Sequence, residues 1–171
     1  MTKDTIAAIA TPIGTGGIGV IRVSGTDALA IIPAVFTSKS DKQKYPSHTA
    51  HYGKLIHPET KEIIDDVVLT VFCNPHSYTG EDVIEISCHG GIPILRAVLD
   101  AVLAAGARIA EPGEFTQRAF LNGRMDLAQA EAVNDLIRAK TDGALRVARH
   151  QLDGDLSNRI ISISNRILGV I

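Results

Sequence analysis

The fold is decided by residues 77–91, which read SYTGEDVIEISCHGG. Within them, Thr79-Gly80 is typical of a turn, and the alternation of apolar residues in 83–88 predicts a strand. Successive side chains of a strand point to opposite faces, so Glu85 shares its face with one apolar and one small residue, two positions away on either side. The sequence therefore predicts a carboxylate in the middle of a sheet face.

A helix is predicted directly after this strand. His89-Gly90-Gly91 allows a tight exit from the strand, and the apolar residues of 92–103 recur at helical spacing. Pro93 fits the first turn of this helix, where a missing N–H costs no hydrogen bond. Glycines before a helix N-terminus let a ligand approach the backbone and favour anionic groups.

The sequence allows two interpretations of Glu85. A carboxylate on a strand can accept a pair of hydrogen bonds from an amidine-like edge, such as that of a pterin or guanine ring. Alternatively, Glu85 lies on a solvated sheet face and the two glycines form only a turn. The spacing of the residues alone leaves both readings open.

Further strands are predicted on both sides of this stretch. Apolar and β-branched runs indicate strands at residues 6–11, 20–25, 49–56, 63–73 and 108–110. We expect residues 65–72 to be buried on both sides, because they are nearly continuously apolar and β-branched. A helix is predicted at residues 27–36 with Thr26 as its cap.

Arg22 is a cation within the otherwise apolar strand 20–25, and alternation places it on the same face as Val20. Either it lies at a sheet edge, or it is the partner of an anion. Just before this strand, Gly14-x-Gly16-x-x-Gly19 matches the dinucleotide fingerprint, but that motif requires a helix after its last glycine and here a strand follows. The sequence also lacks a Gly-x4-Gly-Lys-Ser/Thr phosphate loop.

Composition limits the class of protein. The 171 residues suffice for one ordinary domain and an appendage. A formal net charge of −2 argues against a broad phosphate-binding surface. Two isolated cysteines and six histidines without ligand spacing favour neither a disulfide framework nor a metal site. Because no apolar run reaches transmembrane length and no cleavable signal is present, we expect a cytoplasmic protein without membrane contact.

The sequence turns helical after Pro112-Gly113-Glu114. Helices are predicted at residues 115–121, at 127–140 with Asp126 as cap, and from Asp142 onward. If unbroken at Gly154, the last helix would be roughly 40 Å long. It carries an apolar stripe: Leu145, Ala148, Leu152, Leu156, Ile160, Ile163, Ile167 and Val170. A single shorter helix is left to cover this stripe, so we expect a fragment or a chain that contacts another.

The sequence thus predicts an α+β fold, with a mixed-sheet domain over residues 1–111 and the first helices of an α-helical domain over 112–171. Three long motifs, residues 10–25, 78–91 and 112–131, resemble the N-terminal part of the tRNA-modification GTPase family MnmE, also called TrmE. The resemblance implies a tetrahydrofolate-binding domain similar to the folate domain of the glycine-cleavage aminomethyltransferases. In the family, two such domains form a homodimer, and a folate binds near their junction.

The resemblance also implies a site and a function. Carried over by motif, the folate-binding residues are Arg22, Glu85 and Arg124, with 5-formyltetrahydrofolate or methylenetetrahydrofolate as the ligand; no catalytic or metal-binding residue is implied. Glu85 suits the donor edge of a pterin, and the two arginines suit carboxylates or other polar atoms of the folate. The family commonly has lysine where this chain has Arg124, a change that keeps the charge but alters the hydrogen-bond geometry.

The implied activity belongs to a larger enzyme. Family members hydrolyse GTP and, with the flavoprotein partner MnmG, use a one-carbon unit from tetrahydrofolate to build an aminomethyl-type group on C5 of the tRNA wobble uridine. The GTPase domain, with its GTP, potassium and magnesium, and the C-terminal cysteine motif are absent from these residues, so we expect no GTP hydrolysis by this chain alone. The alternative is a dimerisation and docking module that binds no ligand of its own.

Overall fold

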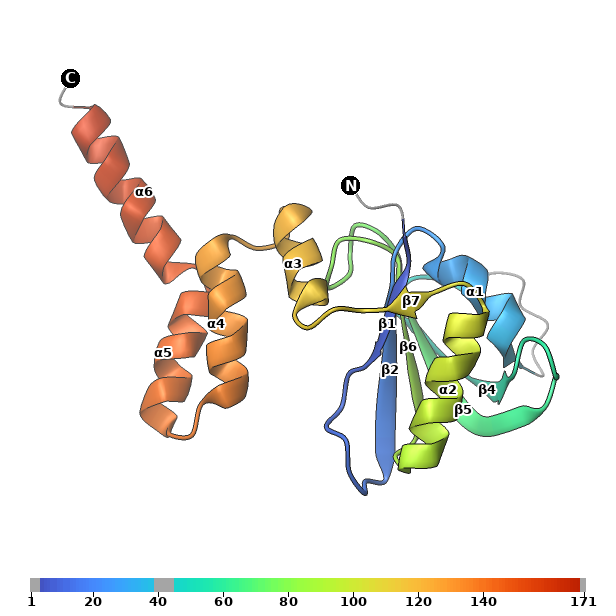
Figure 1. Ribbon diagram of the computed structural model, residues 1–171. Helices are drawn as coiled ribbons and strands as arrows, with labels where there is room; N and C mark the ends of the chain where they lie inside the picture. The colour runs from blue at the N-terminus through green and yellow to red at the C-terminus, as the bar shows by residue number, and fades with distance from the viewer. Residues whose placement is uncertain (1–3, 39–44, 170–171) are drawn as a thin grey trace. The chain divides into compact units, whose positions relative to one another are not determined.

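The computed structural model describes residues 4–38 and 45–169, which fall into two compact units. The first unit ends at Phe115 and contains a mixed sheet with two helices, and the second begins at Thr116 and is helical (Figure 1). The α+β fold expected from the sequence is confirmed. The domain boundary predicted at residue 112 stays a prediction.

Seven strands of the described residues form one sheet, in the order β3-β4-β5-β6-β2-β1-β7. Neighbouring strands are antiparallel, except that β1 and β7 are parallel. In chain order the strands are β1 (Ile6–Ile9), β2 (Ile18–Ser24), β3 (Phe36–Thr37), β4 (Thr49–Ile56), β5 (Ile63–Phe72), β6 (Val83–His89) and β7 (Arg108–Ile109). The strand predicted after the glycine-rich loop is therefore present as β2. The two strands that carry Arg22 and Glu85, β2 and β6, are neighbours inside the sheet.

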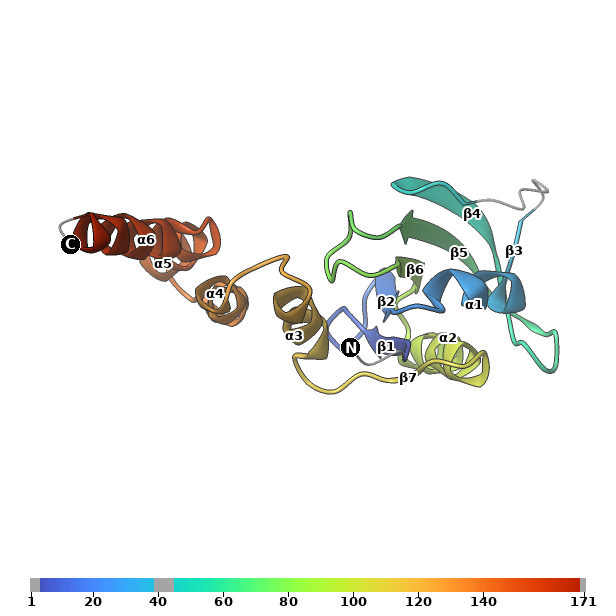
Figure 2. The same ribbon diagram turned by 90° about the horizontal axis from the view of Figure 1, so that it is seen from above.

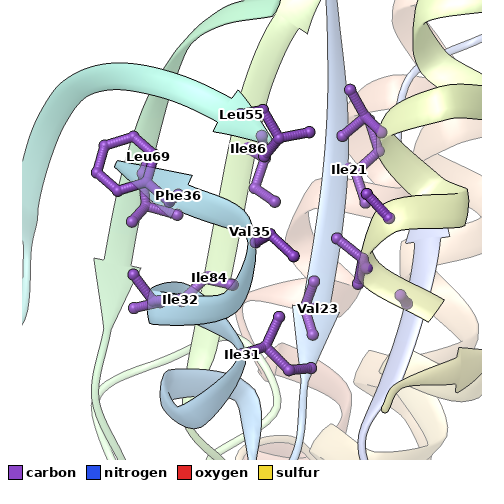
Figure 3. Close-up of a cluster of buried hydrophobic side chains, with 14 of the residues drawn as sticks. Ile21, Val23, Ile31, Ile32, Val35, Phe36, Leu55, Leu69, Ile84 and Ile86 are labelled. Atoms are coloured by element: carbon purple, nitrogen blue, oxygen red, sulfur yellow. The ribbon is translucent and has the colours of Figure 1, made fainter. Parts of the chain in front are cut away.

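Helices α1 (Ala28–Val35) and α2 (Ile92–Ala104) pack on one face of the sheet (Figures 1 and 2). Figure 3 shows α1 side chains meeting those of the central strands. This core is made of aliphatic residues that are almost fully buried: Ile21, Val23, Ile31, Val35, Leu69, Ile84, Ile86, Leu95 and Val98. Along β2 and β6 these residues alternate with less buried ones, so period-two patterning directs one face of each strand to the helices.

The opposite face of the sheet, called the open face below, points away from α1 and α2. It carries Val20, Arg22, Thr70, Glu85 and Ser87, all of them only partly buried. Both charges singled out in the sequence thus lie on the face that the helices leave uncovered.

Strand β5 is buried on one side only, so the expectation of burial on both sides for residues 65–72 was wrong. Val67, Leu69 and Val71 are buried, whereas Val68 is 38% exposed. β-Branched residues also suit a pleated surface that is half exposed, and both helices of this unit lie on the same face. The open face therefore continues across β5.

Helix α1 begins differently from the prediction. Its N-cap is Asp27 and not Thr26, and the Asp27 side chain makes no capping hydrogen bond. The Asp27 N–H donates instead to Thr5 Oγ1, at 3.0 Å. Gly25 has φ +144, and a Cβ there would lie 2.6 Å from the Asp4 carbonyl oxygen, so this close passage requires glycine. A residue distant in sequence thus accepts a hydrogen bond from the N–H of the N-cap residue.

The helices that follow are α3 (Glu114–Leu121), α4 (Leu127–Arg138), α5 (Asp142–Leu152) and α6 (Asp155–Leu168). Asp126 caps α4 as predicted, and a reciprocal pair of hydrogen bonds with Gln129 completes a capping box. The long helix is broken, because Gly154 adopts a left-handed φ of +88 between α5 and α6.

The apolar stripe predicted beyond Asp142 is largely exposed where its side chains are described. Ile160, Ile163 and Ile167 are 57%, 57% and 61% exposed. The Leu156 side chain and Val170 lie outside the described part of the chain. Among the helices of the described residues, none combines the length and apolar composition needed to cross a bilayer.

We expect Ile86→Ala to lower the free energy of unfolding by about 2–5 kcal/mol, because it removes a fully buried side chain and leaves a cavity. The matched control is Ile18→Ala on β2, where the isoleucine is 69% exposed, and its expected change is within about 0.5 kcal/mol. Urea denaturation followed by circular dichroism measures both. Equal losses in the two variants would contradict the assignment of the core to the helix-covered face.

Candidate functional site

Arg22 and Glu85 face each other across the β2–β6 ladder. Arg22 Nε donates to Glu85 Oε1 at 2.8 Å, and Arg22 Nη2 lies 2.7 Å from the same oxygen. The side chains are 28% and 26% exposed, so the pair is accessible from the open face. Of the two readings of Arg22, the partner of an anion is the one that the structure supports.

The pair leaves hydrogen-bonding capacity for a ligand. Both contacts from Arg22 converge on Oε1, and Glu85 Oε2 makes no hydrogen bond within residues 4–38 and 45–169. A carboxylate oxygen has two acceptor positions, so Oε2 can receive N–H groups from outside the protein. Arg22 meanwhile holds the carboxylate in one orientation, which lowers the entropy lost when a ligand binds.

Two aromatic rings flank the Arg22 guanidinium. Its Cζ lies 5.0 Å from the centroid of the Tyr78 ring and 5.7 Å from that of Phe115. At such distances a guanidinium is attracted to the face of an aromatic ring. Neither ring was predicted as a site residue, although both lie in the recognisable motifs; the signal that could have indicated them was their scarcity, since the chain has only four phenylalanines and three tyrosines.

The residues beside the pair are short. Thr70 of β5 is the register partner of Glu85, and Ala8 of β1 is the partner of Arg22. Ser87 follows Glu85 on the same face of β6. The Arg22 guanidinium and the Glu85 carboxylate thus lie side by side on adjacent strands, with short side chains on the strands to either side. A flat polar ring can lie on such a surface.

Arg124 belongs to the second unit, where it is exposed in the turn after α3. Its main-chain N–H donates to the Ala119 carbonyl oxygen at 2.8 Å. The structure therefore brings together two of the three predicted site residues, Arg22 and Glu85, and the role of Arg124 stays a prediction.

Cys88 adjoins the site in sequence but points to the core. Burial, with a smaller contribution from the Asp65 charge, raises the pKa of the Cys88 thiol to about 11. A protonated thiol is a poor nucleophile, so Cys88 is no candidate for covalent chemistry at neutral pH. In the part of the chain that the structure describes, no three His, Cys, Asp or Glu side chains gather as metal ligands.

Fold and site define a chain of two parts: an α+β domain with a charged pair on its open sheet face, and a helical unit. Residues 5–124 match the family model described as GTP-binding protein TrmE N-terminus, and residues 127–171 match that of the MnmE helical domain. The chain therefore belongs to the MnmE/TrmE family, which confirms the resemblance seen in the motifs.

Three similar proteins, each named tRNA modification GTPase MnmE, cover the whole of this chain. Those of Carboxydothermus hydrogenoformans, Enterococcus faecalis and Desulforamulus reducens are 52%, 55% and 54% identical to it. In return, the chain spans 38%, 37% and 38% of their lengths.

We expect Glu85→Gln to change the free energy of unfolding by less than about 1 kcal/mol, because a partly exposed ion pair contributes little to stability. The same limit applies to the coupling between Glu85→Gln and Arg22→Met in a double-mutant cycle. Chemical denaturation measures both quantities. A loss of several kcal/mol would show that the pair serves the fold and argue against a binding role.

Proposed function

We propose that this chain is the folate-binding N-terminal portion of a tRNA modification GTPase. The observation that carries the proposal is the Arg22–Glu85 pair on the open face, with one carboxylate oxygen left available. The names of the relatives support the part concerning tRNA modification and GTP. In this proposal tetrahydrofolate supplies a one-carbon unit, from which the intact enzyme and the flavoprotein MnmG build an aminomethyl-type group on C5 of the wobble uridine.

The residues present fit a reduced folate. The pterin carries an amino group and a ring N–H on one edge, and a fixed carboxylate suits such a pair of donors. Glu85 would accept from this edge, while Arg22 keeps the carboxylate oriented. Arg124 would bind other polar atoms of the folate, as either 5-formyltetrahydrofolate or methylenetetrahydrofolate.

The wider assignment follows the family. We propose a cytoplasmic homodimer whose folate site lies near the dimer junction, and contact with tRNA through the complete complex. GTP, potassium and magnesium would act in a GTPase domain outside these 171 residues.

We expect 5-formyltetrahydrofolate to bind the protein and Glu85→Gln to weaken it about 10- to 100-fold, because hydrogen bonds to a charged group each contribute about 1.5–3 kcal/mol. Isothermal titration calorimetry measures the affinity. The matched control is Asp66→Asn, which removes a carboxylate of β5 that pairs with Lys54, and it should leave binding unchanged. A folded protein that binds no folate, or equal affinity in the wild type and Glu85→Gln, would contradict the proposal.

A second candidate function, a dimerisation and docking module, is favoured by the exposed isoleucines of α6. Ile160, Ile163 and Ile167 are three and four residues apart, which places them on one side of the helix. An apolar row of this kind is typical of a surface that contacts another chain.

If this row mediates self-association, analytical ultracentrifugation will show a dimer at micromolar concentration and a shift to monomer in Ile163→Asp, where a charge would have to be buried. Ser162→Asp, an exposed change on another side of the same helix, is the control and should stay dimeric. A monomeric wild type would rule out the dimerisation function. A dimer that persists in Ile163→Asp would assign self-association to another surface.

A further inference from the structure

A second pair of titratable side chains, Asp65 and His89, lies outside the site described above. The Asp65 carboxylate accepts three hydrogen bonds: from the His89 main-chain N–H at 2.8 Å, from His89 Nδ1 at 2.7 Å and from the Asp66 N–H at 2.9 Å. The Asp65 side chain is 9% exposed, whereas that of His89 is 68% exposed. A mostly buried carboxylate thus holds an imidazole that is open to solvent.

These contacts determine which nitrogen of His89 faces outward. An ionised carboxylate only accepts hydrogen bonds, so His89 Nδ1 must carry a hydrogen. In the neutral ring, Nε2 then has the lone pair, and it makes no hydrogen bond to any residue in 4–38 or 45–169. A carboxylate that fixes the tautomer and orientation of a histidine in this way prepares Nε2 for proton transfer.

The position of His89 relates it to Glu85. Both residues belong to β6 and are four positions apart, so alternation directs both side chains to the open face. At the rise of a strand their Cα atoms are about 13 Å apart, with the small Ser87 between them. In the β2–β6 register, Glu85 lies opposite Arg22, Ser87 opposite Val20 and His89 opposite the exposed Ile18, so a ligand that extends from Glu85 along this end of β6 passes Ser87 and then meets His89.

A purely structural role does not account for the imidazole. The end of β6 requires a partner for the His89 main-chain N–H, and Asp65 supplies it whatever side chain follows. The second contact, from Nδ1, adds an oriented ring whose other nitrogen makes no hydrogen bond within residues 4–38 and 45–169.

We propose that His89, oriented by Asp65, exchanges a proton with a nitrogen of the heterocycle held at Glu85. This inference rests on the proposed folate function. In one-carbon transfer, a nucleophile of the acceptor forms a new bond to the carbon, and the bond from that carbon to the folate nitrogen breaks. The electron pair of the broken bond stays on nitrogen and takes up a proton; the reverse step releases one. His89 gives that proton from Nε2 as the doubly protonated ring, or receives it at Nε2 as the neutral ring, and in both directions Nδ1 keeps its hydrogen bond to Asp65.

The test compares wild type with His89→Asn. The asparagine amide can still donate to Asp65 from near the position of Nδ1, but it has no counterpart of Nε2. We expect its melting temperature to be unchanged and its affinity for 5-formyltetrahydrofolate to stay within about twofold, whereas one-carbon transfer in the intact enzyme should fall about 100-fold or more. Full transfer activity in His89→Asn would overturn the proposal.

Nitrogen-15 NMR of the imidazole provides a readout independent of activity. We expect His89 as the Nδ1–H tautomer without ligand, and a shift of its Nε2 resonance when 5-formyltetrahydrofolate is added. The opposite tautomer, or folate binding that leaves the Nε2 resonance unmoved, would refute the proton-transfer role of His89 and leave the folate function intact. If calorimetry instead detects no folate binding to the wild type, the proposed function fails, and the proton-transfer proposal fails with it.

Discussion

The pairing of β2 with β6 is the constraint on which the rest of the structure depends. Its antiparallel register sets Arg22 opposite Glu85, and the same register sets Ile21 opposite Ile86. The aliphatic pair faces α1 and α2, and the charged pair faces the other way. A shift of one residue would exchange the two faces, burying charges under the helices and exposing the core, so the hydrophobic pattern strongly disfavours it.

The buried core and the Arg22–Glu85 pair differ in how much free energy they contribute to the stability of the fold. Each fully buried aliphatic side chain contributes about 1.5–3 kcal/mol through removal from water. A partly exposed ion pair contributes about 0–1 kcal/mol. The core therefore accounts for most of the stability of the sheet, and the Arg22–Glu85 pair adds little to it. A role in ligand binding accounts for the pair better, because Arg22 orients the carboxylate and leaves one of its oxygens available.

Strand β6 carries both residues to which a ligand-related role is assigned, Glu85 and His89. It carries Glu85 in its middle and His89 at its end, on one face. Glu85 is oriented by an arginine of the strand on one side, and His89 by an aspartate of the strand on the other, since β6 lies between β2 and β5. A rigid strand fixes the spacing between the two groups more firmly than loops would.

The sequence by itself determined the features that depend on near neighbours. Alternation gave the faces of β2 and β6, the glycine turn and Pro93 gave the start of α2, Asp126 gave the cap of α4, and the motifs gave the family. Only the tertiary structure decided which residue meets Glu85, 63 positions away, and which residue accepts from the Asp27 N–H. It also decided that β5 is covered on one side alone. Local preferences arise from sterics and hydrogen bonds within a few residues, whereas strand order and helix placement bring together groups whose separation in sequence carries no information about their distance.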